Sequence, residues 1–113
     1  MQLLFKICAA SEWAGATMTG AFRGSAVDYS AGFIHLSAAH QVRETARKHF
    51  AGREELVLVA LTQERLLGLK WERSRGGDLF PHVHGAIPVS AARWVEPLPL
   101  QGGVHVFPER FLG

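Results

Sequence analysis

The chain has 113 residues, 48% of them hydrophobic and 19% charged, and a formal net charge of +2. This length fits one domain with one modest core, because two cores would each be too small to be stable. The apolar content excludes a disordered tail. The small positive charge allows an anionic ligand but falls short of a surface that coats nucleic acid. We therefore expect residues 1–113 to form a single globular domain.

Cellular location can be judged only from what the sequence does not contain. No apolar run is long enough to span a bilayer, and the first residues lack the basic region and longer apolar core of a signal peptide. The single cysteine, Cys8, has no disulfide partner within the chain. It lies in an expected strand without a nearby basic signal, so we expect a buried and inert thiol. These features predict a cytoplasmic protein.

The first third of the chain is predicted to contain a strand, a short helix and a long loop. Residues 3–9 alternate as a strand does, which would place Lys6 and Cys8 on one face and apolar residues on the other. Ser11 is expected to cap a short helix that carries Trp13. Residues 19–31 are rich in Gly, Ser and Ala and predict a long surface loop, a kind of segment that is often functional or mobile.

That loop leads into residues 32–37, Gly-Phe-Ile-His-Leu-Ser, which place an imidazole in an apolar strand-like run. Ser37 is expected to be the N-cap of the next helix, so His35 would lie near backbone amides that can hold an anion. A core histidine that donates to a carbonyl is an equally good interpretation. Apolar residues recur every fourth position from 38 to 50, which predicts an amphipathic helix, with Arg43 on its solvated face.

The second half of the chain is predicted to consist mainly of short strands. Residues 56–61 form an unbroken apolar run, typical of a strand buried on both faces. Residues 69–73, 87–89 and 94–98 also favour strands, and residues 74–78 favour a turn. Prolines confine the later pieces to edges or bends. The pattern as a whole predicts an α+β fold with a mostly antiparallel or mixed sheet.

Two histidines, His82 and His84, would point the same way on a strand, as metal ligands can. A zinc site would need another ligand from His35, Glu72 or Asp78, and no metal-binding spacing joins them. We therefore favour one histidine lining a pocket and the other facing solvent.

Residues 71–75 combine an aromatic side chain, a carboxylate and cations. Trp71, with Arg73 and Arg75, could supply a stacking surface and anion-binding guanidinium groups. Ordinary strand pairing and exposed charge explain these residues equally well.

The motifs G-F-I-H-L-S, then W-E, then F-P-H-x-x-G resemble the family called domain of unknown function 952, a set of small, mostly bacterial proteins. The resemblance runs from about residue 5 to residue 95 and includes Trp13. The family usually has Tyr where this chain has His84, and the tail from 99 to 113 is unassigned. The resemblance implies membership of a family without an established activity.

A more distant resemblance bears on chemistry. RNA 2'-phosphotransferases, which use NAD and have the ADP-ribosyltransferase-like fold, carry a V-H-L-S segment followed by a helix, an apolar strand and a strand pair. The resemblance implies two short bent sheets, with His35 contacting a ribose or phosphate and an aromatic such as Trp71 stacking on a base. Several catalytic arginines of the transferases have no counterpart here, so a shared fold with changed or lost chemistry is also open.

From these patterns we expect a pocket for a nucleotide-like or other small anionic ligand, with NAD as the first candidate cofactor. RNA is a lesser expectation as a partner, and no membrane is expected. Alternatives are a binding module without turnover and a histidine-based, metal-dependent hydrolase. The expected catalytic residues are His35, Glu72 and His82; the expected ligand-binding residues are Trp13, Ser37, Trp71, Arg73 and His84.

Overall fold

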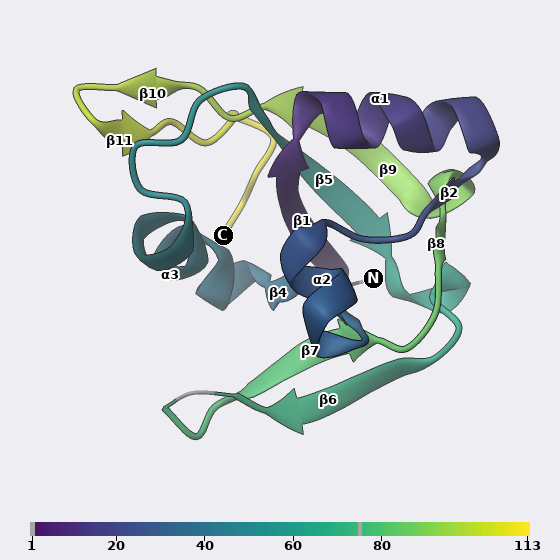
Figure 1. Cartoon of the computed structure of the whole chain (residues 1–113). Helices are drawn as coiled ribbons and strands as arrows, with labels where there is room; N and C mark the ends of the chain where they lie inside the picture. Colours follow the sequence, from purple (N-terminus) through teal and green to yellow (C-terminus); the bar gives the residue numbers. More distant parts are fainter. Residues whose placement is uncertain (1, 75) are drawn as a thin grey trace.

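The computed structural model describes residues 2–74 and 76–113, and within them the chain folds as a small α+β structure with several antiparallel sheets (Figure 1). The α-helices are α1 (Ala10–Thr19), α2 (Ala26–Ala31) and α3 (Ala39–His49). The strands are β1 (Leu3–Ala9), β2 (Ala21–Phe22), β3 (Ile34–His35), β4 (Ser37–Ala38), β5 (Leu56–Thr62), β6 (Leu69–Arg73), β7 (Leu79–Val83), β8 (Ile87–Pro88), β9 (Ala92–Pro97), β10 (Leu100–Gln101) and β11 (Val104–His105). None of the helices in the described ranges is long and apolar enough to cross a membrane.

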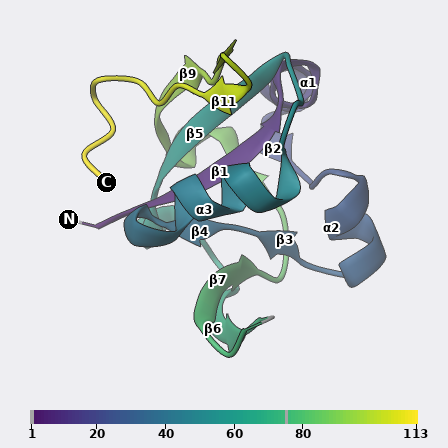
Figure 2. The same cartoon turned by 90° about the vertical axis from the view of Figure 1, so that its left-hand side faces the viewer.

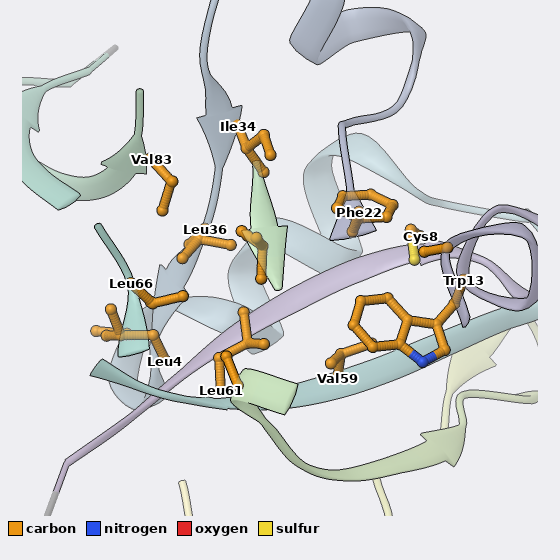
Figure 3. Packing of buried hydrophobic residues seen from close by; sticks show 14 residues of the cluster. Leu4, Cys8, Trp13, Phe22, Ile34, Leu36, Val59, Leu61, Leu66 and Val83 are labelled. Carbon is orange, nitrogen blue, oxygen red and sulfur yellow. The ribbon is translucent and has the colours of Figure 1, made fainter. Parts of the chain in front are cut away.

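The largest sheet has the order β4-β1-β5-β9 and is covered on both faces. Alternation along β1 sends Leu4 and Cys8 into one hydrophobic cluster and Phe5 and Ile7 into a second one. The first cluster also contains Trp13 of α1 (Figure 3). Both the strand over residues 3–9 and its two faces are therefore confirmed. Burial raises the pKa of the Cys8 thiol to about 12, so this cysteine is the buried thiol that the sequence predicts.

The apolar run predicted to be a doubly buried strand is confirmed as β5, which pairs with β1 on one side and β9 on the other. Leu58, Val59, Ala60 and Leu61 are all fully buried. The prediction that prolines mark an edge also holds for β9, the edge strand that ends at Pro97.

Each α-helix begins with the same hydrogen bond, from the N-cap amide to a side-chain oxygen three residues later. The amides of Ala9, Ser25 and Ala38 donate to Glu12, Asp28 and Gln41, at 2.9, 2.8 and 2.9 Å. This is the half of a capping box in which the third helical residue reaches back to the cap. The caps expected from Ser11 and Ser37 are wrong, because Ser11 lies inside α1 and Ser37 belongs to β4.

The segment from 19 to 31 is not one long loop, which corrects the sequence-based prediction. It contains β2, paired with β8, and the six-residue helix α2. A helix this short carries no clear period, so its caps are its main signal. The sequence signal was the Ser25-x-x-Asp28 pattern at its start.

The helix expected over residues 38–50 is confirmed as α3, with Val42 and Ala46 on its buried stripe. Arg43 is exposed, so the expectation of a solvated face is confirmed. Its guanidinium lies over the rings of Phe107 and Phe111, at 4.6 and 5.0 Å from their centroids. The tail that had no recognisable pattern therefore folds back onto α3 and closes the second hydrophobic cluster.

A second sheet, of order β3-β7-β6, gathers three motifs that lie far apart in the sequence (Figure 2). His35 of β3 pairs directly with His82 of β7, and Lys70 of β6 pairs with His82 from the other side. In the turn predicted over residues 74–78, the amide of Gly77 donates to the carbonyl of Ser74 at 3.0 Å. Arg75, which the sequence suggested as an anion-binding cation, lies outside the described residues.

Candidate functional site

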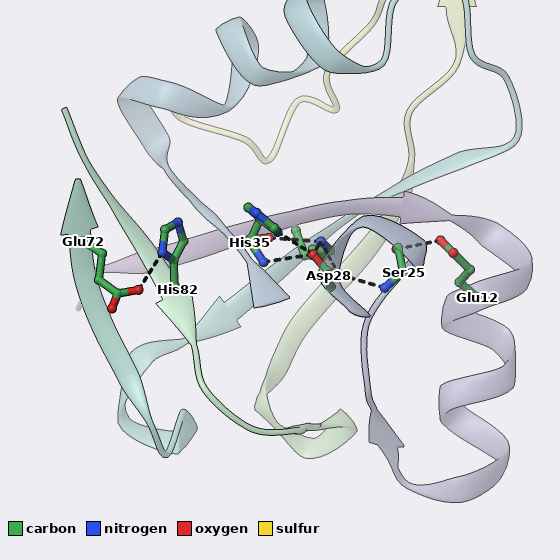
Figure 4. A network of polar contacts seen from close by, with 7 residues as sticks. Glu12, Ser25, Asp28, His35, Glu72 and His82 are labelled. Carbon is green, nitrogen blue, oxygen red and sulfur yellow. Dashed lines mark hydrogen bonds and ion pairs between the residues drawn. The ribbon is translucent and has the colours of Figure 1, made fainter. Parts of the chain in front are cut away.

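The site is built around Asp28, whose side chain is 1% exposed and accepts hydrogen bonds from three elements (Figure 4). Nδ1 of His35 lies 2.7 Å from Oδ1, and the His35 amide donates to the same oxygen at 3.1 Å. The Lys6 ammonium donates to Oδ2 at 2.9 Å, and the Ser25 amide donates to it at 2.8 Å. These donors leave the carboxylate firmly oriented toward His35.

Lys6 is the counter-charge that makes this buried carboxylate tolerable. Its side chain is only 5% exposed, and its ammonium also donates to the carbonyl of His35 at 3.1 Å. A buried charge without a partner would cost several kcal/mol. Burial alone would raise the pKa of Asp28, but the hydrogen bond from His35 and the charge of Lys6 outweigh it and hold that pKa well below its ordinary value. Asp28 is therefore ionised at neutral pH.

A second carboxylate supports the other two histidines. Oε1 of Glu72 lies 2.8 Å from Nδ1 of His82 and 2.9 Å from Nε2 of His84. These hydrogen bonds, that of His84 first, lower the pKa of Glu72. The His82 side chain is 5% exposed, whereas those of Glu72 and His84 are 37% and 36% exposed. One oxygen of Glu72 is therefore hydrogen-bonded to two imidazoles, and the carboxylate lies partly exposed to solvent.

Phe33 holds the three imidazoles together. Its ring stacks on His82 with centroids 4.2 Å apart, and it lies 4.7 Å from the ring of His35 and 5.3 Å from that of His84. The rings of His35 and His82 meet edge to face at 5.4 Å. We call Asp28, His35, His82, Glu72 and His84 the histidine cluster.

The ring orientations decide which chemistry the histidine cluster can perform. The carboxylates of Asp28 and Glu72 are acceptors, so Nδ1 of both His35 and His82 carries a proton. Within the described part of the chain, Nε2 of neither ring has a protein partner, and the His35 ring is 39% exposed. A neutral His35 can therefore accept a proton at Nε2, and a protonated one can donate to an anion.

The remaining residues expected at the site lie elsewhere. Trp13 is buried against Phe22, with ring centroids 5.6 Å apart. Trp71 and Arg73 alternate with Glu72 along β6 and so lie on the opposite face of the sheet from the histidines. Ser37 is buried and contacts the Thr45 hydroxyl at 2.9 Å. None of these positions supports the expected ligand contact.

Sequence reasoning missed Asp28 and Lys6. The signal for Lys6 was its place on the core-facing side of β1, where a cation needs a buried partner. Two surface hollows lie apart from the three histidines. One, of about 230 Å³, lies by Glu12, Phe22 and Tyr29, and the other, of about 470 Å³, lies by Leu3 and Trp94.

Metal binding at the histidine cluster receives no geometric support. No group of three or more histidine, cysteine or acidic side chains among the described residues is arranged to hold an ion. In the cluster, the carboxylates point at imidazole nitrogens and satisfy them directly. Each carboxylate thus orients an imidazole through its Nδ1 atom.

The fold and site define a small α+β protein that carries carboxylate-supported histidines on an antiparallel sheet. Residues 7–95 match the model of the family described as Protein of unknown function (DUF952), and the chain belongs to that family. The expectation from the G-F-I-H-L-S, W-E and F-P-H motifs is thereby confirmed. A search of curated proteins found no match.

Solved structures similar to this chain come from protein CC0527 of Caulobacter crescentus. Its crystal structure is 47% identical, with a TM-score of 0.87, and the alignment covers 92% of this chain and 93% of the other. Its solution NMR structure is 48% identical, with a TM-score of 0.81, and the alignment covers 92% and 91% of the two chains.

Proposed function

We propose that the histidine cluster binds a small anionic, phosphate-bearing ligand such as a nucleotide, and that His35 is its acid–base group. The observation that carries this proposal is the pairing of a half-exposed imidazole with a fully buried carboxylate, 2.7 Å from its Nδ1. Such a pair holds the ring in one tautomer and stabilises the imidazolium that forms when the ring takes up a proton.

The charges around the cluster favour an anion once the rings are protonated. Lys6 neutralises Asp28, and Lys70 lies directly opposite His82 in the strand pair. Each imidazole that takes up a proton then adds a positive charge. A phosphate can accept from Nε2 of His35 and of His82, and charge-assisted hydrogen bonds of this kind are the strong ones.

Two imidazoles 5.4 Å apart also suit group transfer. One can take the proton of an attacking hydroxyl while the other gives a proton to the leaving group. The resemblance to RNA 2'-phosphotransferases makes NAD-dependent ADP-ribosyl or phosphoryl transfer the first reaction to test. In this scheme Glu72 positions His82 and His84, because its Oε1 already accepts hydrogen bonds from both rings. Phe33, at the centre of the rings, replaces Trp71 as the aromatic available to a base.

A ligand screen tests the proposal. Thermal shift followed by calorimetry is run with inorganic phosphate, AMP, ADP-ribose and NAD, since a ligand that binds only the folded state raises the melting temperature. We expect a phosphate-bearing compound to bind, and His35→Ala to weaken its binding by at least about tenfold, equivalent to the loss of one good hydrogen bond.

The matched control is His40→Ala, an exposed histidine on α3. It should bind as the unmodified protein does. Binding that His35→Ala leaves unchanged would end the proposal. Binding lost in His35→Ala, with no product from NAD or ADP-ribose, would leave a binding module on the same site.

A further inference from the structure

The strand β6 forms the outer edge of the sheet β3-β7-β6. Figures 1 and 2 both show β6 at the outside of the molecule, with β7 between it and the rest of the chain. Among the residues that the structure describes, no strand pairs with its outer side. An open edge presents backbone N–H and C=O groups that can pair with another extended segment.

The direction of these groups follows from Pro81. Its carbonyl accepts from the Leu36 amide at 2.9 Å, so its backbone faces β3 and not β6. Opposite residues of an antiparallel pair either exchange both hydrogen bonds or neither. Trp71, opposite Pro81, therefore points its N–H and C=O toward the open edge. By alternation, Leu69 and Arg73 do the same.

The sequence of this edge, Leu-Lys-Trp-Glu-Arg, is complementary to itself. When two copies run antiparallel about Trp71, Lys70 of each faces Glu72 of the other. Opposite charges directly across a strand pair are favourable. Among the described residues Lys70 has no ion-pair partner, and His82 and His84 both contact Oε1 of Glu72, so Oε2 is available.

Apolar surface accompanies the charges. Trp71 is 39% exposed and Leu79 is 50% exposed. Leu79 pairs with Arg73, which places it on the same face of the sheet as Trp71. Pairing about Trp71 would bring the two indoles side by side and cover part of this surface.

We propose that β6 is a dimerisation edge, through which two copies of this chain pair antiparallel about a twofold axis at Trp71. The two sheets then continue into one. The contact is isologous, so it closes at two copies. A five-residue strand with a few apolar neighbours makes a small interface, and such interfaces dissociate on dilution.

The dimer would also affect the histidine cluster. Lys70 of the second copy would lie beside Oε2 of Glu72 and add a cation next to His82 and His84. This consequence rests on the proposed function, whereas the dimer itself does not.

Sedimentation velocity from about 10 μM to about 1 mM tests the edge. We expect a concentration-dependent dimer. Lys70→Glu places like charges opposite each other, and Trp71→Pro removes both the indole and an outward-pointing N–H, so each should raise the dissociation constant at least about tenfold. The double variant Lys70→Glu/Glu72→Lys exchanges the two charges and should dimerise again. Lys48→Glu, the same charge change on α3, is the control and should dimerise as the unmodified protein does.

A thiol at the axis gives a second measurement. Opposite Cα atoms in a hydrogen-bonded antiparallel pair lie about 5.5 Å apart, which suits a disulfide. Trp71→Cys should form a linked dimer on mild oxidation, and Leu67→Cys, another exposed position, should not. Cys8 is buried and should not compete.

Two outcomes would overturn the proposed dimer. The first is a protein that stays monomeric at every concentration. The second is a Lys70→Glu variant that keeps its native circular dichroism and dimerises as tightly as the unmodified protein. Ligand binding by a monomer would leave the proposed function intact, so the two failures can be told apart.

Discussion

His35 and His82 occupy directly opposed positions on β3 and β7, and each ring is held at Nδ1 by its own carboxylate. One carboxylate, Asp28, is fully buried, and the other, Glu72, is open to solvent. The pair is therefore asymmetric. The carboxylate that holds His35 lies in the core, whereas the carboxylate that holds the buried ring of His82 lies at the surface.

Asp28→Asn should be strongly destabilising. The substitution removes the charge that pairs with buried Lys6 and leaves that ammonium uncompensated. Breaking a buried pair from one side costs about 3–5 kcal/mol, which corresponds to a loss on the order of 10 °C in melting temperature. Calorimetry measures it. Glu44→Gln breaks an exposed pair on α3 and should leave the melting temperature unchanged; equal effects of the two variants would contradict the role given to Asp28.

Acid should destabilise the protein through the same carboxylate. The pKa of Asp28 is lower in the folded than in the unfolded chain, so its ionised form stabilises the fold at every pH above the unfolded value of about 3.9. That contribution falls as the pH drops below this value and is lost below the folded pKa. Urea unfolding between pH 7 and pH 2 should show that the free energy of unfolding decreases toward acid. The stability gap between the unmodified protein and Asp28→Asn should narrow over the same range, and a constant gap would refute this account.

The elements that the sequence predicted well are those whose pattern reflects burial along a single strand or helix. The alternation of β1, the apolar run of β5 and the stripe of α3 all depend on side chains meeting the core at regular intervals. The short helix α2 has no such periodic pattern, so its segment was predicted to be a loop. The buried position of Asp28 was therefore not predicted.

The site was predicted only in part, for a related reason. The resemblance of motifs indicated that His35, Glu72 and His82 belong together, and the sheet does bring them together. Which side of β6 faces them depends on register, and register placed Trp71 on the other face. The partner of Lys6 could not be read from β1, because Asp28 approaches from an element 22 residues away.

Phe111→Ala should show that the C-terminal tail is part of the core. Phe111 is 6% exposed and packs edge to face on Phe5 with centroids 5.0 Å apart. Truncating a buried phenylalanine costs about 3–5 kcal/mol. Leu112→Ala is the neighbouring control, since Leu112 is 94% exposed and should cost almost nothing. Denaturant unfolding separates the two, and an equally small loss in both would mean that the tail only rests on the surface.

Anion binding at the histidine cluster should strengthen as the solution is made more acidic, because each imidazole that takes up a proton adds a positive charge beside the anion. The imidazolium forms of His35 and His82 donate from Nε2 and add positive charge, while Asp28 stays ionised beneath them. Calorimetric titration at several pH values with inorganic sulfate, whose own charge does not change near neutral pH, measures the effect. His35→Gln, which keeps a polar side chain but cannot become charged, should flatten the pH dependence as well as weaken binding. His40→Ala should keep the full dependence. Affinity that does not change with pH in the unmodified protein would show that the imidazoles do not contact the anion.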